Sequence, residues 1–333
     1  MNSKRISFLI FFISCTLLVS AQTSTYVIKP LSERATEVYG YLIGQECYLQ
    51  KIKTKFPDLQ SKITLAQFSF DRTFGKSKEN LKDYFKLHLG EKEFNELEMK
   101  VLTGIRKSMN NQTFTEEIAF NFITEVENRA KGQIASQFLE TLLSFQFLDK
   151  PEDEFLKGFT KIFKTKGHLK AKGTDWQIKV PKSWRAEEGD RPNIIQKFSN
   201  DNCKYRQNIT LLVKELPLPK DYKITEEELN EFFTEKEMKG GIPPEGKFVA
   251  FKKMTFDANI GCMLEIEQIL KRLDFTMKIR EISYMFIRDN KQYILSITVG
   301  SEKLDADLTI EIQKYFPLYR QIANSIVVND QYN

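Results

Sequence analysis

Glu265 and Glu267 are the residues whose types and spacing come closest to a catalytic pair. They lie two apart in a segment of alternating apolar and charged residues, so a strand would place both carboxylates on one face. Two carboxylates can act as general acid and base, as in many hydrolases. One hypothesis is therefore a carboxylate-dependent hydrolase with its site between two domains. The alternative is a solvated strand face, on which Lys278 and Arg280 of the next expected strand pair with the glutamates.

Other residues and motifs that could be catalytic are few. The chain has two histidines, His88 in a helical segment and His168 in a basic one, and neither belongs to an H-E-x-x-H motif. The sequence also has no C-x-x-C motif and no G-x-S-x-G motif. We therefore expect no metal site and no cofactor, and we expect both histidines to be solvated.

The segment from Gly241 to Lys247 has the G-x-x-x-x-G-K spacing of a phosphate-binding loop. Such a loop binds phosphate through successive backbone N–H groups, which Pro243 and Pro244 lack. Phe248 also stands where Ser or Thr would hold magnesium. We interpret the segment as a stiff connection between a helix and a strand.

Three cysteines follow the N-terminal segment: Cys47, Cys203 and Cys262. In an oxidising compartment Cys203 and Cys262 are the possible disulfide pair, since both fall in the same expected domain. The alternative is that all three are buried free thiols that pack as small apolar residues.

Charge gives no strong indication of a partner. Lys and Arg together number 50 against 45 acidic residues, a formal net charge of +5. Lysines do cluster around Phe159 and Phe163, and exposed aromatics in a basic patch can bind nucleic acid. Because this cluster coincides with an expected linker, we predict no nucleic-acid partner.

Residues 1–21 have the order of a secretory signal peptide. Lys4 and Arg5 precede an uncharged run from Ile6 to Val19, and small residues end at Ala21. An uncleaved anchor and a lipid-modified Cys15 are the alternatives, although the run is shorter than a bilayer span. We expect an exported chain, periplasmic or extracellular, with no transmembrane segment after signal removal.

Residues 22–163 are expected to form an all-α domain of five to seven helices, because apolar residues recur at helical spacing. Pro57 and Gly90 are placed as breaks between helices, and Thr113 with Glu116 has capping-box spacing. Residues 164–173 contain four lysines and two glycines and are expected to be a linker.

Residues 174–333 change to period-two alternation, which predicts an antiparallel sheet. Asp289-Asn290 predicts a tight turn between two strands. Thr225 with Glu228 predicts a capped helix, and a later amphipathic stripe predicts a second helix with a kink or break at Pro317. Residues 326–328 predict a short closing strand.

This order of elements resembles the PsbP-like family over residues 173–329. The matching motifs are a strand that ends in Pro181 and is followed by Trp184, and a late helix that runs into Asn324-Ser325 and an apolar run. The resemblance implies an α+β fold, a PsbP-like antiparallel sheet flanked by helices, with the four named residues as folding positions. It also implies a binding or assembly factor without a shared catalytic constellation.

We therefore expect an α+β chain in which an N-terminal all-α domain precedes the sheet domain. Its function is expected to be non-enzymatic binding or assembly, with an unknown protein or small ligand of the cell envelope or medium as partner. The alternatives are the hydrolase that uses Glu265 and Glu267, and a carrier of a small ligand or lipid.

Overall fold

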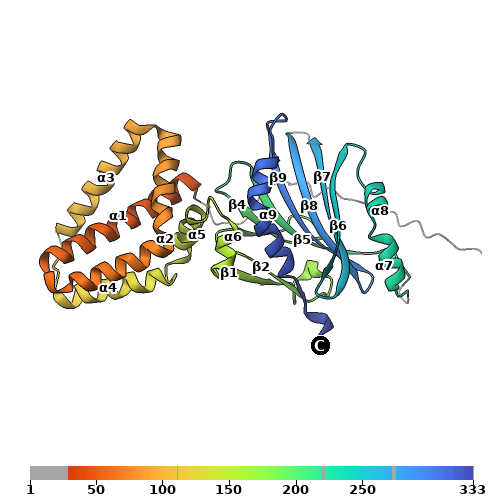
Figure 1. Cartoon of the computed structure of the whole chain (residues 1–333), viewed down its shortest axis with the longest axis horizontal. Coiled ribbons are helices and arrows are strands. Elements are labelled where there is room, and N and C mark those ends of the chain that lie inside the picture. The colour runs from red at the N-terminus through yellow and green to blue at the C-terminus, as the bar shows by residue number, and fades with distance from the viewer. Residues whose placement is uncertain (1–28, 111, 220–221, 272–274, 333) are drawn as a thin grey trace, which may run out of the picture. The chain divides into compact units, whose positions relative to one another are not determined.

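The computed structural model describes residues 29–110, 112–219, 222–271 and 275–332, so the expected signal peptide lies outside the described residues. The chain divides into a helical unit that ends at Glu154 and a sheet unit that begins at Phe155 (Figure 1). The predicted order, helices first and an antiparallel sheet with flanking helices second, is confirmed. Within the described ranges, no helix combines the length and apolar character needed to cross a membrane.

The helical unit contains five long helices, with the short 3₁₀ turn η1 (Pro57–Leu59) between the first two. They are α1 (Leu31–Lys55), α2 (Gln60–Leu89), α3 (Glu91–Asn110), α4 (Glu116–Ala130) and α5 (Ser136–Gln146).

Helix α2 shows why these segments are helical. Its buried side chains recur every three to four residues and form one stripe: Ile63, Ala66, Phe70, Phe74, Ser77, Leu81 and Phe85. The helix ends where Gly90 takes a φ of 82°, which only glycine adopts without strain. The cap of α4 differs from the prediction, because the Thr115 side chain, not that of Thr113, accepts from the Ile118 N–H.

The sheet unit begins with helix α6 (Glu152–Leu156), which straddles the boundary between the units. Strands β1 (Thr160–Lys164), β2 (Trp176–Pro181) and β10 (Val327–Val328) form a small antiparallel sheet in the order β1-β2-β10. The predicted closing strand is therefore confirmed as β10.

Seven further strands form the large antiparallel sheet, in the order β3-β4-β5-β9-β8-β7-β6. They are β3 (Arg185–Glu188), β4 (Ile194–Asn200), β5 (Arg206–Glu215), β6 (Gly246–Phe256), β7 (Asn259–Lys271), β8 (Thr276–Arg288) and β9 (Lys291–Ser301). Strands β6 to β9 pair in chain order as a meander, and Asp289 and Asn290 both have positive φ in the predicted turn between β8 and β9.

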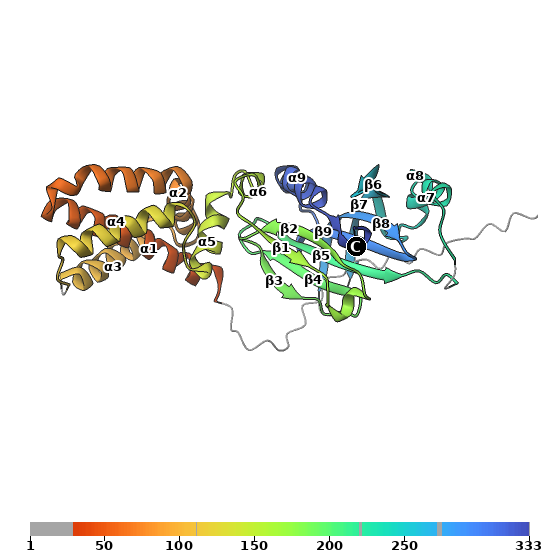
Figure 2. The same ribbon diagram turned by 90° about the horizontal axis from the view of Figure 1, so that it is seen from below.

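The two faces of the large sheet bury different clusters. On β8, Ile282, Tyr284 and Phe286 belong to the main core, whereas Met285 and Ile287 on the other face belong to a second core. Helix α9 (Thr309–Asn324) and the small sheet pack on the main core, and Figure 2 shows α9 beside β2 and β9. Helices α7 (Glu226–Phe232) and α8 (Glu235–Gly240) pack on the second core.

The expected linker at residues 164–173 is not a linker between the units. Phe163 lies on β1, which pairs with β2, so the sheet unit begins before the expected boundary. The segment after β1 is a connection closed by hydrogen bonds: the Thr165 hydroxyl donates to the Thr174 carbonyl at 3.0 Å. A lysine-rich composition hid this strand, because the strand is short and only part of one face is buried.

The second correction concerns Pro317, where the sequence predicted a kink or break. Helix α9 runs unbroken from Thr309 to Asn324 with Pro317 inside it. Burial of Ile312, Tyr319 and Ile322 against the sheet outweighs the hydrogen bond that proline removes. The predicted capping box is confirmed, because Thr225 and Glu228 each bond to the other's backbone N–H.

Gly261 tests how closely β7 and β8 pack. A Cβ atom at this position would lie 2.1 Å from the carbonyl oxygen of Met285, which is backbone and cannot move aside. We expect Gly261→Ala to lower the free energy of unfolding by about 2–3 kcal/mol, measured by urea denaturation. Gly104→Ala is the matched control: nothing lies within 4 Å of its new Cβ, and alanine in a helix should add up to about 1 kcal/mol. Equal effects of the two substitutions would contradict the packing described here.

Candidate functional site

The structure gives each of the two candidate glutamates its own basic partner. Arg280 Nε bonds to Glu265 Oε1 at 2.7 Å, and Lys278 Nζ lies 3.5 Å from Glu267 Oε2. Both pairs run diagonally between β7 and β8, because Arg280 stands opposite Glu267 in the register. The pairing of opposite charges that the sequence offered as an alternative is therefore what the structure contains.

Glu265 lines a pocket. A cavity of about 320 Å³ lies between α9 and strands β7 and β8, lined by Glu265, Arg280, Thr309, Ile312, Gln313, Phe316 and Pro317. We call it the α9 pocket. The Glu265 side chain is 9% exposed and that of Arg280 is 15% exposed, so the ion pair forms a nearly buried floor. Glu267 does not line the cavity.

Local folding explains how the α9 pocket is built. Alternation on β7 and β8 turns Glu265 and Arg280 toward the face that α9 covers. Leu308 and Ile312 are buried in the main core and hold the first turn of α9 against the sheet. The Thr309 hydroxyl then lies 3.3 Å from Arg280 Nη1, and Phe316 with Pro317 closes the next turn of the wall.

Tyr284 adds a buried hydroxyl near this floor. Its side chain lies on β8, is 1% exposed, and its hydroxyl has no hydrogen-bond partner among the described residues. Burial raises the pKa of Tyr284 well above its ordinary value, and the nearby Glu265 charge raises that pKa further. The hydroxyl is therefore a protonated donor beside the ion pair.

The histidines and cysteines do not form a reactive centre in the described residues. His88 Nδ1 contacts the Tyr84 carbonyl of its own helix at 2.7 Å, and His168 accepts from the Lys170 N–H at 3.2 Å. No group of three or more potential metal-binding side chains occurs in the described part of the chain.

Cys203 and Cys262 are free thiols, so the disulfide that the sequence left open is not formed in this structure. Cys203 packs against the main core and Cys262 lies in the second core, on the opposite face of the sheet. Burial raises the pKa of each thiol to about 12, which keeps both protonated and poorly nucleophilic.

The two remaining sequence features have structural explanations. The segment 241–247 connects α8 to β6, as the proline argument predicted. Among the clustered aromatics, Phe163 packs against the main core and meets Phe198 edge to face at 5.7 Å, so it offers no open ring for a base.

A polar band that the sequence analysis missed crosses the opposite face of the large sheet. Cross-strand neighbours form a row through Ser199, Asn208, Thr298 and Glu281, and each of these side chains is at least nine-tenths buried. Ser296 donates to Glu281 Oε1 at 2.8 Å. The four members come from four different strands, so only the pairing of strands reveals the band.

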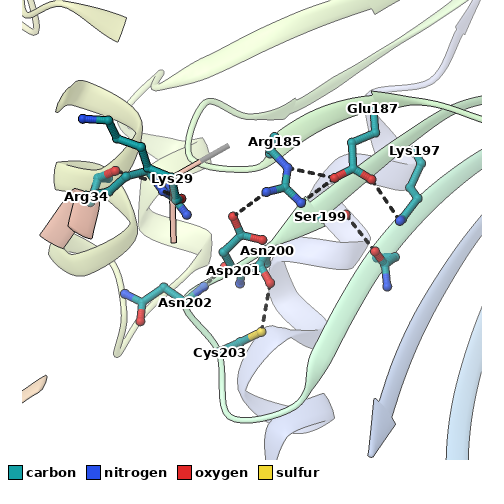
Figure 3. Close-up of polar contacts among 12 residues, drawn as sticks. Lys29, Arg34, Arg185, Glu187, Lys197, Ser199, Asn200, Asp201, Asn202 and Cys203 are labelled. Atoms are coloured by element: carbon teal, nitrogen blue, oxygen red, sulfur yellow. Dashed lines mark hydrogen bonds and ion pairs between the residues drawn. The ribbon is translucent and has the colours of Figure 1, made fainter. Parts of the chain in front are cut away.

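At the β3 edge the band ends in an ion-pair network, shown in Figure 3. Glu187 accepts from Arg185 Nε at 2.8 Å and from Lys197 Nζ at 3.0 Å, and Arg185 Nη1 also reaches Asp201 at 3.1 Å. Burial opposes ionisation of Glu187, but Lys197 and Arg185 outweigh it and lower the pKa of the carboxyl.

The lowered pKa of Glu187 predicts a pH-dependent contribution to stability. This contribution is present above the unfolded-state pKa of about 4.3 and is lost as the pH falls through the lower folded-state pKa. We expect Glu187→Gln to cost up to about 1 kcal/mol at pH 7, since the site is half-buried and screened, and to cost much less below about pH 3.5. Urea denaturation of both proteins across this range measures the difference, with the exposed Glu245→Gln as control. A difference that stays constant with pH would contradict the assignment.

The helical unit has a cavity of its own, between α1 and α2. Its volume is about 480 Å³, and its lining includes Glu46, Lys53, Phe68 and Asp71. Burial raises the pKa of Asp71, but its carboxylate accepts from Gln67 at 2.7 Å, and Glu46 is paired with Lys78 at 2.6 Å. The Glu46 side chain is 41% exposed, against 9% for Glu265, so the α9 pocket with its nearly buried ion pair is the stronger candidate.

The fold and the pocket define the class of the sheet unit: an antiparallel α+β domain with a small cavity under its last helix. No protein-family model matches the chain, and no curated protein matches it.

Solved structures do match about half of the chain. They include PsbP of the cyanobacterium Synechocystis (11% identity, 51% of this chain and 92% of that chain, TM-score 0.31). The Ran-binding protein Mog1p of Saccharomyces cerevisiae also matches (10% identity, 52% and 97%, TM-score 0.35). A third is LpqN of Mycobacterium tuberculosis, described as involved in cell envelope biogenesis (11% identity, 54% and 96%, TM-score 0.31). PsbP is thus among the solved structures that match about half of the chain, and at these TM-scores the matches carry no argument about function.

The sequence analysis found two members of the candidate site and missed the others. Alternation singled out Glu265, and Arg280 was expected, together with Lys278, to pair with the two glutamates. Thr309, Gln313 and Phe316 carried no signal, because they read as ordinary positions of an amphipathic helix. Only the packing of α9 on β7 and β8 places these three side chains beside the ion pair.

Proposed function

We propose that this protein is an exported binding protein that holds a small ligand in the α9 pocket without transforming it. Export is supported by the charge, apolar run and small residues of the first 21 positions. Binding is supported by one observation above the others: a cavity whose floor is a nearly buried ion pair of Glu265 and Arg280. Charged groups placed inside a small cavity orient a polar ligand.

The same ion pair argues against the hydrolase alternative. A pair of carboxylates that shares a reaction needs both groups to face one substrate, with one of them able to give up a proton. Glu265 is held by Arg280 inside the pocket, while Glu267 lies outside it beside Lys278. Each carboxylate accepts a bond from a basic group and is not positioned as a donor.

The pocket also favours a small polar ligand over a lipid. About 320 Å³ is near the lower end of the usual range for small-molecule sites, roughly 300–1,000 Å³. Binding a hydrocarbon chain over the ion pair of Glu265 and Arg280 would be unfavourable, because the ion pair would lose contact with water without gaining a polar partner. The carrier alternative is therefore supported only for compact polar ligands.

The proposal predicts that small ligands stabilise the chain through this pocket. The probes are panels of small carboxylic acids, amines, amino acids and monosaccharides, tested by thermal shift on the chain without residues 1–21. We expect at least one panel to raise the melting temperature of the wild type but not of Gln313→Trp. Gln313 is an exposed residue of the lining, so the new indole should fill the cavity and leave the core unchanged. The matched control is Ile310→Trp, an exposed residue on the same helix but outside the lining.

Two outcomes would overturn this function. One is the absence of a shift with every panel. The other is chemical conversion of a panel compound, followed by NMR, that is lost in Glu265→Gln, since this would favour the hydrolase.

A further inference from the structure

The α9 pocket contains one cation and one anion side by side, which is an unusual floor for so small a cavity. Glu265 and Arg280 both line it, and the other lining side chains are uncharged. A ligand with a single charge would meet one attractive and one repulsive partner there. A ligand that carries both charges a short distance apart would meet two attractive partners.

Both members of the ion pair retain hydrogen-bonding capacity. Arg280 has five N–H groups, of which Nε donates to Glu265 and Nη1 donates to Thr309. Arg280 Nη2 and Glu265 Oε2 have no hydrogen-bond partner among the described residues. A ligand carboxylate can accept from the guanidinium, and a ligand ammonium can donate to the carboxylate.

The charges around the pocket are also balanced. Lys278 pairs with Glu267 just beyond the floor. Asp307 precedes α9, and its pKa is lowered mainly by hydrogen bonds from Thr309 and also by the charges of Lys278 and Arg280. Together these five groups carry two positive and three negative charges, so the surroundings favour neither a strongly anionic nor a strongly cationic ligand.

The walls of the pocket are apolar on one side. Ile312, Phe316 and Pro317 all come from α9 and face the cavity above the ion pair. The site therefore combines a two-charge polar end with an apolar wall large enough for a short aliphatic side chain.

We propose that the α9 pocket binds the zwitterion of a free α-amino acid with an aliphatic side chain. The ligand's carboxylate bonds to Arg280, its ammonium bonds to Glu265, and its side chain packs against Phe316 and Ile312. This inference rests on the proposed function, whose ligand class it names.

The test is a titration of the chain without residues 1–21 with three matched probes, followed by isothermal titration calorimetry. L-leucine carries both charges, L-leucinamide lacks the carboxylate, and 4-methylpentanoate lacks the ammonium. We expect L-leucine to bind, and each analogue to bind at least about tenfold more weakly, because each leaves one member of the buried ion pair without its ligand partner.

Three substitutions locate the binding. Glu265→Gln and Arg280→Gln should each weaken L-leucine binding by at least about tenfold, since one charged contact is lost in each. Glu267→Gln, on the same strand but outside the lining, should bind like the wild type. If either substitution of the ion pair prevents folding, Gln313→Trp closes the cavity from the exposed side and should abolish binding in a folded chain.

The outcomes separate this inference from the proposed function. No binding of L-leucine at about 10 mM, or binding that Gln313→Trp leaves unchanged, overturns the zwitterion assignment. Equal binding of 4-methylpentanoate and L-leucine overturns it as well, and leaves an anion site that still agrees with the proposed function. A thermal shift with another panel but not with amino acids likewise overturns the zwitterion assignment and agrees with the proposed function. If no panel gives a thermal shift, the zwitterion assignment and the proposed function are both overturned.

Discussion

The antiparallel pairing of β7 with β8 is the constraint on which the rest of the sheet unit depends. It places Gly261 against the Met285 carbonyl, sets the two diagonal ion pairs, and turns alternate side chains toward two different cores. A shift of one residue in this register would exchange the two faces and move both glutamates to the side of α7 and α8. The pocket therefore exists because the register is fixed by burial on both faces.

The ion pair of Glu265 and Arg280 is better understood as a recognition device than as a source of stability. Removing two charges from water is costly, and a buried pair often contributes little net stability. Its position under α9 and inside a cavity gives it directional contacts for a ligand. Pro317, which lies within the unbroken helix α9, also lines the pocket. The packing of α9 on the sheet therefore sets the shape of the pocket as well.

Much of the fold could be predicted from local patterns, and the errors have identifiable causes. The strand at residues 160–164 was missed because its sequence is rich in lysine and only its pairing with β2 makes it a strand. The cap at Thr115 was placed two residues early because Thr113 has Glu116 three residues on, whereas the residue three after Thr115 is Ile118. The polar band across β4, β5, β9 and β8 could not be found in one strand, because its members meet only across strands.

The sequence by itself determined the change from helical to alternating periodicity, the turn at Asp289-Asn290, the capping box at Thr225, and the pairing of the two glutamates with Lys278 and Arg280. These follow from spacing within a few residues or between adjacent strands, where backbone geometry dictates which side chains share a face. Only the tertiary structure decided that Glu265 but not Glu267 lines the α9 pocket, that Cys203 and Cys262 lie on opposite faces, and that Pro317 is tolerated. Each of these features depends on how α9 and distant strands pack. The free energy gained by burying their side chains outweighs the local conformational preferences of the sequence.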